Sequence, residues 1–342
     1  MARETVKIQD VARAAGVSTA TVSRTLSNPT VVSESTRKAV LEAVSATGYR
    51  VNRAARNLRT QRTGSILTLV PDLGNPFFSQ IISGIEQVFS KAEYSVLVSD
   101  TANMSLEGMP LSHVFQDGQA DGVILLDGLV PKSSINSVKG TPNENLVIYA
   151  CEWSDDVVIP SIRSDNWAGV ELAVNHLADL GHTRIGHISG PDENVLTKVR
   201  REAFFEAAKM RGLEIHEDWL FEGNFKLASG AVAAEKFLAL KHRPTAVFSA
   251  SDLMAMGFIS NLLDANINVP GEVSVVGFDD IDLAPYFRPA LTTIHQDRRR
   301  IGRIAAETLL SCLSTPQNTD SKFRHVVPVE LVERGSTGPC KQ

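Results

Sequence analysis

The sequence predicts a small all-α domain followed by a larger α/β domain with parallel sheets. Three observations predict this. Residues 8–47 carry apolar side chains at helical spacing, interrupted by a glycine. From Ser65 onward, short runs rich in Val and Ile alternate with longer stretches of helical period. The 342 residues are also too many for one ordinary core, so two or three domains are expected.

Residues 1–48 are expected to form the helical domain. The first helix has an apolar stripe at i, i+3, i+4 and i+7, made of Ile8, Val11, Ala12 and Ala15. Gly16 then permits a sharp, left-handed turn. A third helix, from about Glu34 to Thr47, would bury Val40, Ala43 and Val44. The pattern is that of a helix-turn-helix unit.

The second helix is expected from Thr19 to about Ser27, with Ser18 as its N-cap. Val22 and Leu26 are four residues apart and face the core, so Thr19, Ala20 and Arg24 project outward. Such a helix fits the DNA major groove, where an arginine makes two hydrogen bonds to guanine. Neighbouring hydroxyls can donate to phosphates and set the register; these are Ser18, Thr21 and Ser23. The alternative is a helical hairpin in which Arg24 is simply solvated.

The distribution of charge favours DNA binding by this domain alone. The net charge of the chain is −5. Residues 1–62 hold 11 Lys and Arg against 4 Asp and Glu, a balance of +7, which leaves −12 for residues 63–342. A basic head on an acidic body indicates that only the head meets a polyanion.

Residues 49–62, YRVNRAARNLRTQR, are basic and have a small apolar stripe of Ala54, Ala55 and Leu58. A helix here would have about eight residues, which is too short to persist alone in water. The segment is therefore either a linker or a helix that forms only when something supports it.

The body, residues 63–342, is predicted to consist of β-α-β units. The expected strands are SILTLVP, YSVLVSD, DGVILLDG, NLVIYA, RIGHISG, AVFSAS and VSVVGFD, and helices such as FFSQIISGIEQVFSKA and WAGVELAVNHLADLG separate them. Strands rich in Val and Ile with helices between them are typical of parallel sheets. There are enough units for two sheets of five or six strands. The tail after Gly335 is expected to be loose.

Several classes of function find no support in the residues. The eight histidines and three cysteines (Cys151, Cys312 and Cys340) have no metal-ligand spacing, so no metal or other cofactor is expected. A Rossmann G-x-G-x-x-G after the first strand of the body, a P-loop and a G-x-S-x-G elbow are missing, which argues against an enzyme. No apolar run could span a bilayer, and the first residues lack a secretory h-region, so a cytoplasmic protein is expected.

The longest blocks of sequence carry a resemblance to a known family. They are IQDVARAAGVSTATVSRTLSNP, VPDLGNPFFSQIISGIE, HLADLGHTRIGHISGP and VPGEVSVVGFDDIDLAPYFRPALTTIHQD. In this order they resemble the LacI/GalR family of bacterial transcriptional regulators, from about residue 6 to residue 337. The resemblance implies a homodimer that binds double-stranded operator DNA and is controlled by a small molecule. We expect the small molecule to release the DNA, although co-repression stays open.

The resemblance also assigns DNA-binding residues. Thr19, Ala20 and Arg24 match the base-reading positions of the second helix. Residues 52–59 match the hinge helix of the family, with Asn52, Ala55 and Leu58 at DNA-contacting positions. The leucine wedges into the minor groove, where unstacking a base step costs a few kcal/mol and is offset by extra wrapping of the DNA. Val51 stands where many relatives have proline, so the start of the hinge lacks a fixed φ.

The body resembles the two-lobed periplasmic-binding-protein fold, in which small ligands bind between the lobes. One lobe is expected to comprise residues 63–162 and 292–324, the other residues 163–291 and 325–337. The resemblance implies that the ligand contacts Asp72, Asn75, Phe77, Phe78, Arg200, Phe225, Ser251, Asp252, Asp279 and Gln296. Each residue has an ordinary structural alternative: one phenylalanine of the pair in the core, the aspartates as turn caps, and Arg200 paired with Glu202 or Glu206.

One departure from the family leaves the ligand class open. Many sugar-responsive relatives have an Asp-Arg pair after the fourth strand, where this chain has Cys151 and Glu152. A carboxylate that grips hydroxyls is therefore moved or lost. Trp153 either reaches the rim of the cleft or packs within the lobe. The expected ligand is a monosaccharide, a sugar alcohol or a nucleoside. A sugar-binding protein of the transport type has the same fold but lacks a basic head.

Overall fold

The computed structural model describes residues 6–49, 62–102, 110–315 and 322–341. The chain divides between Thr63 and Gly64 into a small unit, called the head below, and a large unit, called the body.

The described part of the head contains the helices that the sequence predicts. They are α1 (Ile8–Ala15), α2 (Thr19–Ser27) and α3 (Glu34–Thr47), with a 3₁₀ turn at Pro29–Val31. Gly16 ends α1 in the left-handed conformation, with φ 67°. The hydroxyl oxygen of Ser18 caps α2 by accepting from the Thr21 N–H at 3.1 Å. Val11, Val22 and Val40 form the core with no exposed surface, so these predictions are confirmed.

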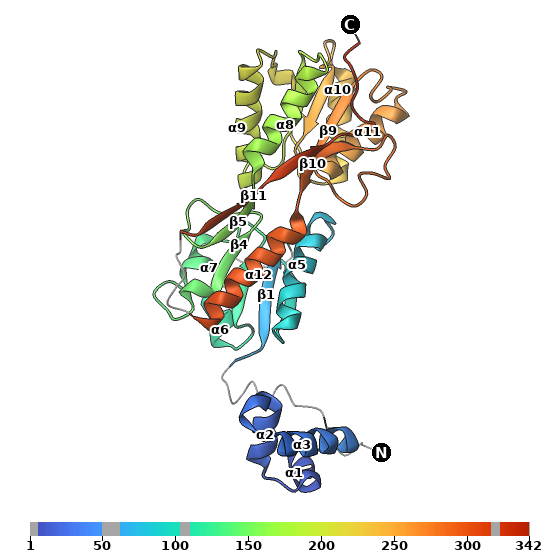
Figure 1. The fold of residues 1–342 in the computed structure, drawn as a ribbon. Coiled ribbons are helices and arrows are strands. Elements are labelled where there is room, and N and C mark those ends of the chain that lie inside the picture. Colours follow the sequence, from blue (N-terminus) through green and yellow to red (C-terminus); the bar gives the residue numbers. More distant parts are fainter. Residues whose placement is uncertain (1–5, 50–61, 103–109, 316–321, 342) are drawn as a thin grey trace. The chain divides into compact units, whose positions relative to one another are not determined.

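The first lobe of the body is built on one sheet. Its order is β11-β5-β4-β3-β1-β2, with all neighbouring strands parallel. The strands are β1 (Ser65–Val70), β2 (Ser95–Asp100), β3 (Gly122–Leu125), β4 (Val147–Ala150), β5 (Ser161–Ser164) and β11 (Arg324–Val327). The helices are α5 (Phe77–Lys91), α6 (Leu111–Gln116), α7 (Lys132–Asn136) and α12 (Arg298–Ser314). Figure 1 shows α5 and α12 side by side on one side of this sheet.

The second lobe repeats this arrangement. Its sheet has the order β12-β10-β9-β8-β6-β7. The strands are β6 (Ile185–Ile188), β7 (Leu220–Phe221), β8 (Ala246–Ser249), β9 (Ser274–Asp279), β10 (Thr292–Gln296) and β12 (Val329–Val332), of which β12 is antiparallel to β10. Helices α8 (Asn166–Asp179) and α9 (Val195–Met210) pack together on one side, and α10 (Leu227–Ala239) and α11 (Asp252–Asp264) on the other (Figure 1). Apart from this antiparallel edge strand, the sheet is parallel, as the sequence predicts.

The crossovers between the lobes come later in the chain than predicted. In the described part of the body, the chain passes from one sheet to the other after β5, after β10 and after β11. These points lie at residues 164–166, 296–298 and 327–329. Residues 292–296 therefore belong to the second lobe, and residues 324–327 to the first. β10 and β11 are both short, so an error of a few residues in the predicted boundary assigned most of each strand to the wrong lobe.

The carboxyl-terminal tail is not loose, contrary to expectation. The Ser336 side chain is fully buried, and its hydroxyl accepts from the Thr292 N–H at 2.8 Å and donates to the Val275 carbonyl at 2.7 Å. Further on, the Cys340 N–H donates to the Leu180 carbonyl at 2.9 Å. Hydrogen bonds thus hold the tail against the second lobe, and its polar sequence does not predict them.

Glycines allow α5 and α12 to cross in close contact. A Cβ atom added to Gly302 would lie 2.0 Å from the Ile81 carbonyl oxygen, and one added to Gly84 would lie 2.2 Å from the Arg299 carbonyl oxygen. Backbone oxygens cannot move aside as a flexible side chain can. We therefore expect Gly302→Ala to destabilise the protein by roughly 1–3 kcal/mol through overpacking. Urea unfolding measures this, and Ser311→Ala on the exposed face of the same helix is the control. Equal unfolding midpoints in both variants would contradict the close crossing.

Candidate functional site

The head presents an exposed helix end suited to the DNA major groove. Thr19, Ala20 and Arg24 are exposed at the start and middle of α2, opposite the buried Val22. The hydroxyls of Ser18 and Thr21 lie 2.9 Å apart and hydrogen-bond to each other. Ser23 is half-buried. The placement agrees with a base-reading role for the exposed residues.

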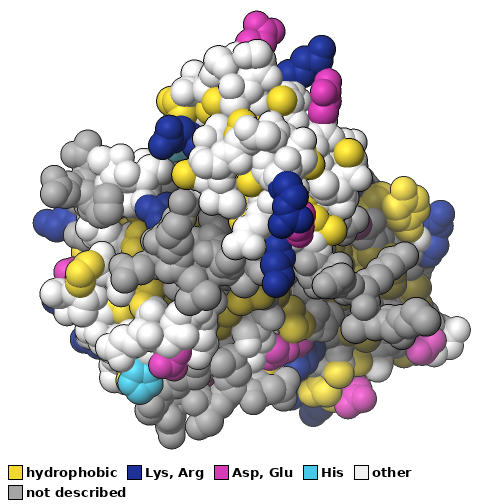
Figure 2. Space-filling model, turned by 90° about the horizontal axis from the view of Figure 1, so that it is seen from below, with side chains coloured by type: hydrophobic (Ala, Val, Ile, Leu, Met, Phe, Trp, Pro, Cys, Tyr) yellow, Lys and Arg dark blue, Asp and Glu magenta, His cyan; other side chains and the backbone are white. Residues whose placement is uncertain are grey.

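The basic residues of the head lie only partly within the described structure. Of the 11 Lys and Arg side chains in residues 1–62, Arg3, Arg50, Arg53, Arg56 and Arg59 fall outside it. So do the predicted hinge residues Asn52, Ala55 and Leu58. Figure 2 shows one face of the molecule, on which the described Lys and Arg side chains are spread among acidic and apolar ones.

A cavity of about 710 Å³ lies between the two lobes of the body. Eight of the ten predicted ligand residues line it: Asp72, Asn75, Phe77, Phe78, Arg200, Phe225, Ser251 and Asp279. They come from loops at the carboxyl ends of strands and from the first two turns of helices, where open parallel sheets generally bind ligands. Asp252 and Gln296 are placed behind this wall.

Arg200 is the central polar residue of the cavity. It extends from α9 and is 2% exposed, which makes it the largest fully buried side chain described. Its Nε donates to Asn166 Oδ1 at 2.8 Å and its Nη1 donates to the Ala250 carbonyl at 2.5 Å. Its guanidinium lies 3.8 Å from the ring centroid of Phe278 and does not pair with Glu202 or Glu206 in the described contacts. Nη2 has no partner among the described residues, so its two N–H groups are left for a ligand.

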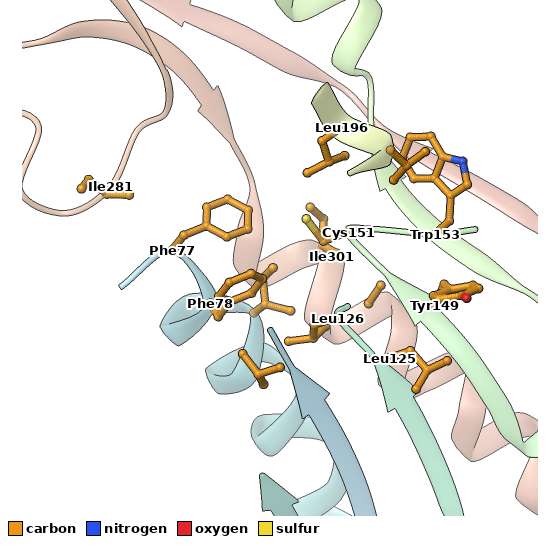
Figure 3. Close-up of a cluster of buried hydrophobic side chains, with 14 of the residues drawn as sticks. Phe77, Phe78, Leu125, Leu126, Tyr149, Cys151, Trp153, Leu196, Ile281 and Ile301 are labelled. Atoms are coloured by element: carbon orange, nitrogen blue, oxygen red, sulfur yellow. The ribbon is translucent and has the colours of Figure 1, made fainter. Parts of the chain in front are cut away.

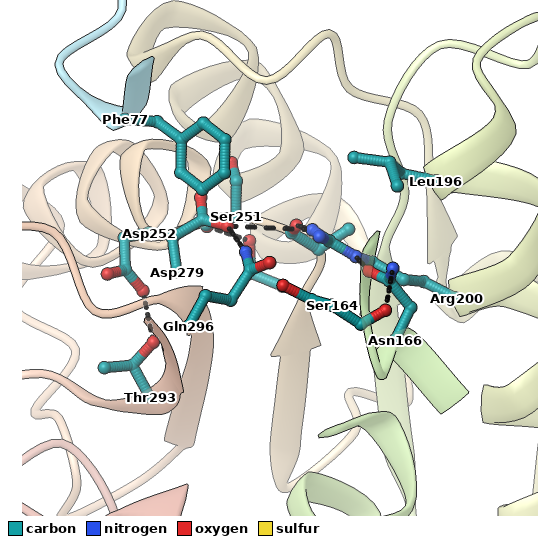
Figure 4. Close-up of polar contacts among 12 residues, drawn as sticks. Phe77, Ser164, Asn166, Leu196, Arg200, Ser251, Asp252, Asp279, Thr293 and Gln296 are labelled. Carbon is teal, nitrogen blue, oxygen red and sulfur yellow. Dashed lines mark hydrogen bonds and ion pairs between the residues drawn. The ribbon is translucent and has the colours of Figure 1, made fainter. Parts of the chain in front are cut away.

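Asp279 ends β9 beside this arginine, as Figure 4 shows. Its Oδ1 lies 3.8 Å from Arg200 Nη1 and accepts from Gln296 Nε2 at 2.7 Å. Burial raises the pKa of Asp279, and Arg200 opposes that shift. Its φ of 125° is rare for a residue with a side chain. Strain of this kind is common at ligand sites and turns the carboxylate toward the cavity.

Asp252 and Gln296 support the wall from behind. The two carboxylate oxygens of Asp252 accept from the Thr293 hydroxyl and from the Ile281 N–H, and the residue is fully buried. Burial raises the pKa of Asp252 well above its usual value. Gln296 orients Asp279 through its amide. In this structure both residues act on the ligand cavity through their neighbours.

Aromatic rings form the apolar part of the wall. Phe77 and Phe78 are each 5% exposed and meet edge to face with ring centroids 5.1 Å apart. Both belong to the core and both line the cavity, whereas the sequence suggested that one of them is core. In Figure 3 they lie near Leu196 of the second lobe. Phe225 packs against Gly190, where an added Cβ would lie 2.2 Å from its ring.

An ion pair joins the lobes at the wall. Lys226 Nζ of the second lobe lies 3.1 Å from Asp72 Oδ2 of the first. Burial alone would raise the pKa of Asp72, but the hydrogen bonds from Lys226 and from the Gly74 N–H lower it below the usual value. Asn75 caps α5 by accepting from the Phe77 N–H at 3.0 Å. The two polar residues therefore have structural partners as well as a place on the wall.

Sequence reasoning missed several residues of the first-lobe wall. Thr101, Asp127 and Glu152 line the cavity just after β2, β3 and β4. The Thr101 hydroxyl donates to Asp127 Oδ2, and the Gly128 N–H donates to Glu152 Oε2 at 2.9 Å. The available signal for Asp127 and Glu152 was the first polar residue after a buried strand, whereas β2, which precedes Thr101, is largely exposed. Trp153 packs within its lobe, with Arg163 3.9 Å from its ring centroid.

Glu152 is expected to make stability depend on pH. It is 4% exposed, and burial raises its pKa from 4.5 to about 7, despite hydrogen bonds from the Gly128 N–H and the Asn194 side chain. Between these values the folded state holds a proton that the unfolded state has lost, so folding stability falls as pH rises through this window.

Glu152→Gln should remove this penalty. We expect the variant to be more stable than the wild type by about 2–3 kcal/mol at pH 8 and to show no gain at pH 4. Urea unfolding at both pH values measures the difference, with the exposed Glu235→Gln as the matched control. An equal effect of Glu152→Gln at pH 4 and pH 8 would mean that Glu152 does not titrate as described.

The described residues contain no cluster of three or more His, Cys, Asp or Glu side chains that could hold a metal ion. Among them, no helix is both long and apolar enough to cross a bilayer.

Comparisons with known proteins agree with this architecture. Residues 7–52 match the model of the bacterial regulatory proteins, lacI family, and residues 174–337 match a periplasmic binding protein-like domain. The transcriptional repressor CytR of Escherichia coli (strain K12) is 37% identical over 331 residues, 96% of each chain.

Two further proteins are similar over nearly the whole chain. The repressor PurR of Photobacterium profundum is 35% identical, covering 96% of this chain and 98% of its own length. The crystal structure of the lac repressor dimer bound to operator and the anti-inducer ONPF has a TM-score of 0.84 at 29% identity, covering 98% and 100% of the two chains. The chain therefore belongs to the lacI family of bacterial regulatory proteins and is a DNA-binding transcriptional regulator.

Proposed function

We propose that this regulator is a repressor that binds a nearly palindromic operator as a homodimer and releases it when a small molecule occupies the cavity of the body. The observation that carries the proposal is the cavity itself. It is walled by both lobes, and a buried arginine keeps an unpartnered Nη2 there. The lobes can adopt more than one arrangement, and a compound that contacts both lobes shifts the equilibrium between these arrangements only if it binds one arrangement more tightly than the other.

The head supports the DNA part of the proposal. Its α2 exposes Thr19, Ala20 and Arg24 on a folded three-helix unit, and its formal charge is positive. In a homodimer, one such helix would enter the major groove at each half of the operator. The lac repressor, which this chain resembles along its length, was crystallised as a dimer on its operator.

The body supplies the coupling. The lobes are joined by the crossovers after β5, β10 and β11, and Lys226 of one lobe holds Asp72 of the other across the wall. A rotation of the lobes relative to each other would change the distance between the hinge segments, residues 49–62, of the two protomers. The affinity of the two heads for DNA would change with that distance. A coupling free energy of roughly 1–3 kcal/mol is enough for ordinary regulation.

Two measurements on the full chain test the proposal. Selection of duplexes from a random pool should enrich a nearly palindromic sequence. A thermal-shift screen against sugars, polyols and nucleosides should give a stabilising compound, worth about 2.7 kcal/mol at 100 times its Kd, and that compound should release the selected duplex. Enrichment of a duplex without a palindromic sequence would contradict binding as a homodimer. If the protein prefers no duplex over random ones, the whole proposal is wrong. A compound that tightens DNA binding would make it a co-repressor.

A further inference from the structure

We propose, resting on the function above, that Asn166 is a positioning residue, which couples Arg200 on the cavity wall to the crossover after β5. Gln296 does the same for Asp279 and the crossover after β10. The two amides transmit the effect of a bound compound to the backbone that joins the lobes, and neither of them is among the residues that line the cavity.

The amide of Asn166 connects the cavity wall to the first crossover. Asn166 is the first residue of α8, directly after the chain leaves β5, and it is 3% exposed. Its Oδ1 accepts from Arg200 Nε at 2.8 Å, and its Nδ2 donates to the Ser164 carbonyl at 3.0 Å (Figure 4). Both contacts are satisfied only by a side chain that offers one acceptor and one donor. The position therefore requires an amide.

The amide of Gln296 forms the corresponding connection at the second crossover. Gln296 is the last residue of β10 and is 1% exposed. Its Nε2 donates to Asp279 Oδ1 at 2.7 Å, and the same oxygen lies 3.8 Å from Arg200 Nη1. Arg200 thus stands between two crossovers, with Asn166 on one side and Asp279 and Gln296 on the other.

The guanidinium of Arg200 joins the two connections rigidly. Its atoms lie in one plane, so a compound that displaces Nη2, which has no partner among the described residues, also displaces Nε and Nη1. A buried polar group is costly to leave without a hydrogen bond. Asn166 therefore follows the guanidinium, and the Ser164 carbonyl follows Asn166. In this way binding at the wall favours one arrangement of the lobes over the other.

Asn166→Asp separates the two contacts of the amide. A carboxylate beside Arg200 stays ionised and still accepts from Nε, but it cannot donate to the Ser164 carbonyl. A negative charge in the first turn of α8 is also favourable for the helix. Asn166→Ala removes both contacts. The matched control is Asn136→Asp, which makes the same change at an exposed residue of α7.

The measurement compares affinity with coupling in the full-length protein. The probes are ribose, glucose, glucitol, cytidine and adenosine, and the one that changes operator binding most in the wild type is used on the variants. Calorimetry gives its Kd, and the ratio of the operator Kd values with and without it gives the coupling. In Asn166→Asp this ratio should fall by about 2- to 30-fold, while the Kd of the compound stays near the wild-type value. Asn166→Ala should lose both, and Asn136→Asp neither.

Amide hydrogen exchange tests each connection without operator DNA. In the wild type the compound should change the exchange of residues 164–169 and of residues 296–301. In Asn166→Asp the first change should vanish and the second persist. Gln296→Met should show the reverse, because it removes the donor to Asp279, whereas Gln296 Oε1 has no partner among the described residues.

The outcomes separate this inference from the proposed function. If Asn166→Asp keeps the wild-type ratio while a probe releases the wild type from its operator, the regulator stands and only the role of Asn166 is rejected. A ratio that falls merely in step with the affinity for the compound also overturns that role. If no probe changes operator binding by the wild type, this inference and the proposed function are both wrong. Should Asn166→Asp not fold, unchanged exchange at both crossovers of the wild type with the compound overturns the inference.

Discussion

Arg200→Ala is expected to abolish the response to the effector while the protein still binds its operator. The variant lacks the contacts of the arginine with Asn166, with the Ala250 carbonyl and with the ring of Phe278, and it lacks the Nη2 group that has no partner among the described residues. Removing one partner of a buried ion pair costs about 3–5 kcal/mol, because it leaves the other charge buried without compensation. Here that charge is Asp279.

The next residue of the same helix is the matched control. Arg201 is 46% exposed and lies 3.3 Å from Asp192 on the surface. Arg201→Ala removes the same charge but should leave both effector binding and operator release unchanged, because exposed ion pairs contribute little. Titration of each variant with the compound found by thermal shift, followed by operator binding with and without it, measures the difference. Normal release by Arg200→Ala would show that the ligand does not use this cavity wall.

The head could be predicted in detail because its signals are local. The stripe of α1, the turn at Gly16 and the cap at Ser18 each depend on residues within one or two turns, and each is found as expected. The fold class of the body was predictable for the same reason, since β1, β3, β4, β8 and β9 are buried runs with clear ends. Strands β5, β7 and β11 are two to four residues long, and most have polar members. Their pairing depends on distant neighbours.

The residues that line the cavity could be predicted only in part from the sequence. The resemblance located Arg200 and Asp279 on the wall, and both line the cavity. It could not show that Asp252 is fully used by Thr293 and Ile281. It left open whether the carboxylate at Cys151 and Glu152 is moved or lost, and the structure places Glu152 on the wall. Whether such a carboxyl group faces the cavity depends on its side-chain and backbone partners in other elements, and a single sequence does not reveal these partners.

Arg24→Ala is expected to remove preference for the operator and leave the body unchanged. The arginine is exposed on the same face of α2 as Ala20, one turn earlier, and the helix is held by Val22 and Thr25 on its buried side. A bidentate arginine–guanine contact is worth about 1–3 kcal/mol of discrimination against the wrong base. Affinity for the selected operator should therefore fall by that amount, and affinity for random duplex should fall far less.

A second arginine of the head separates base reading from charge. Arg13 lies on α1, its side chain is 81% exposed, and it is 3.6 Å from Asp10. Arg13→Ala removes one positive charge, so any loss of binding should be equal for operator and random duplex and should shrink at high salt. Binding of both variants to both duplexes over a range of salt concentrations makes the comparison. If Arg24→Ala weakens the two duplexes equally, as Arg13→Ala should, Arg24 contributes only charge, and the reading of bases must come from other residues.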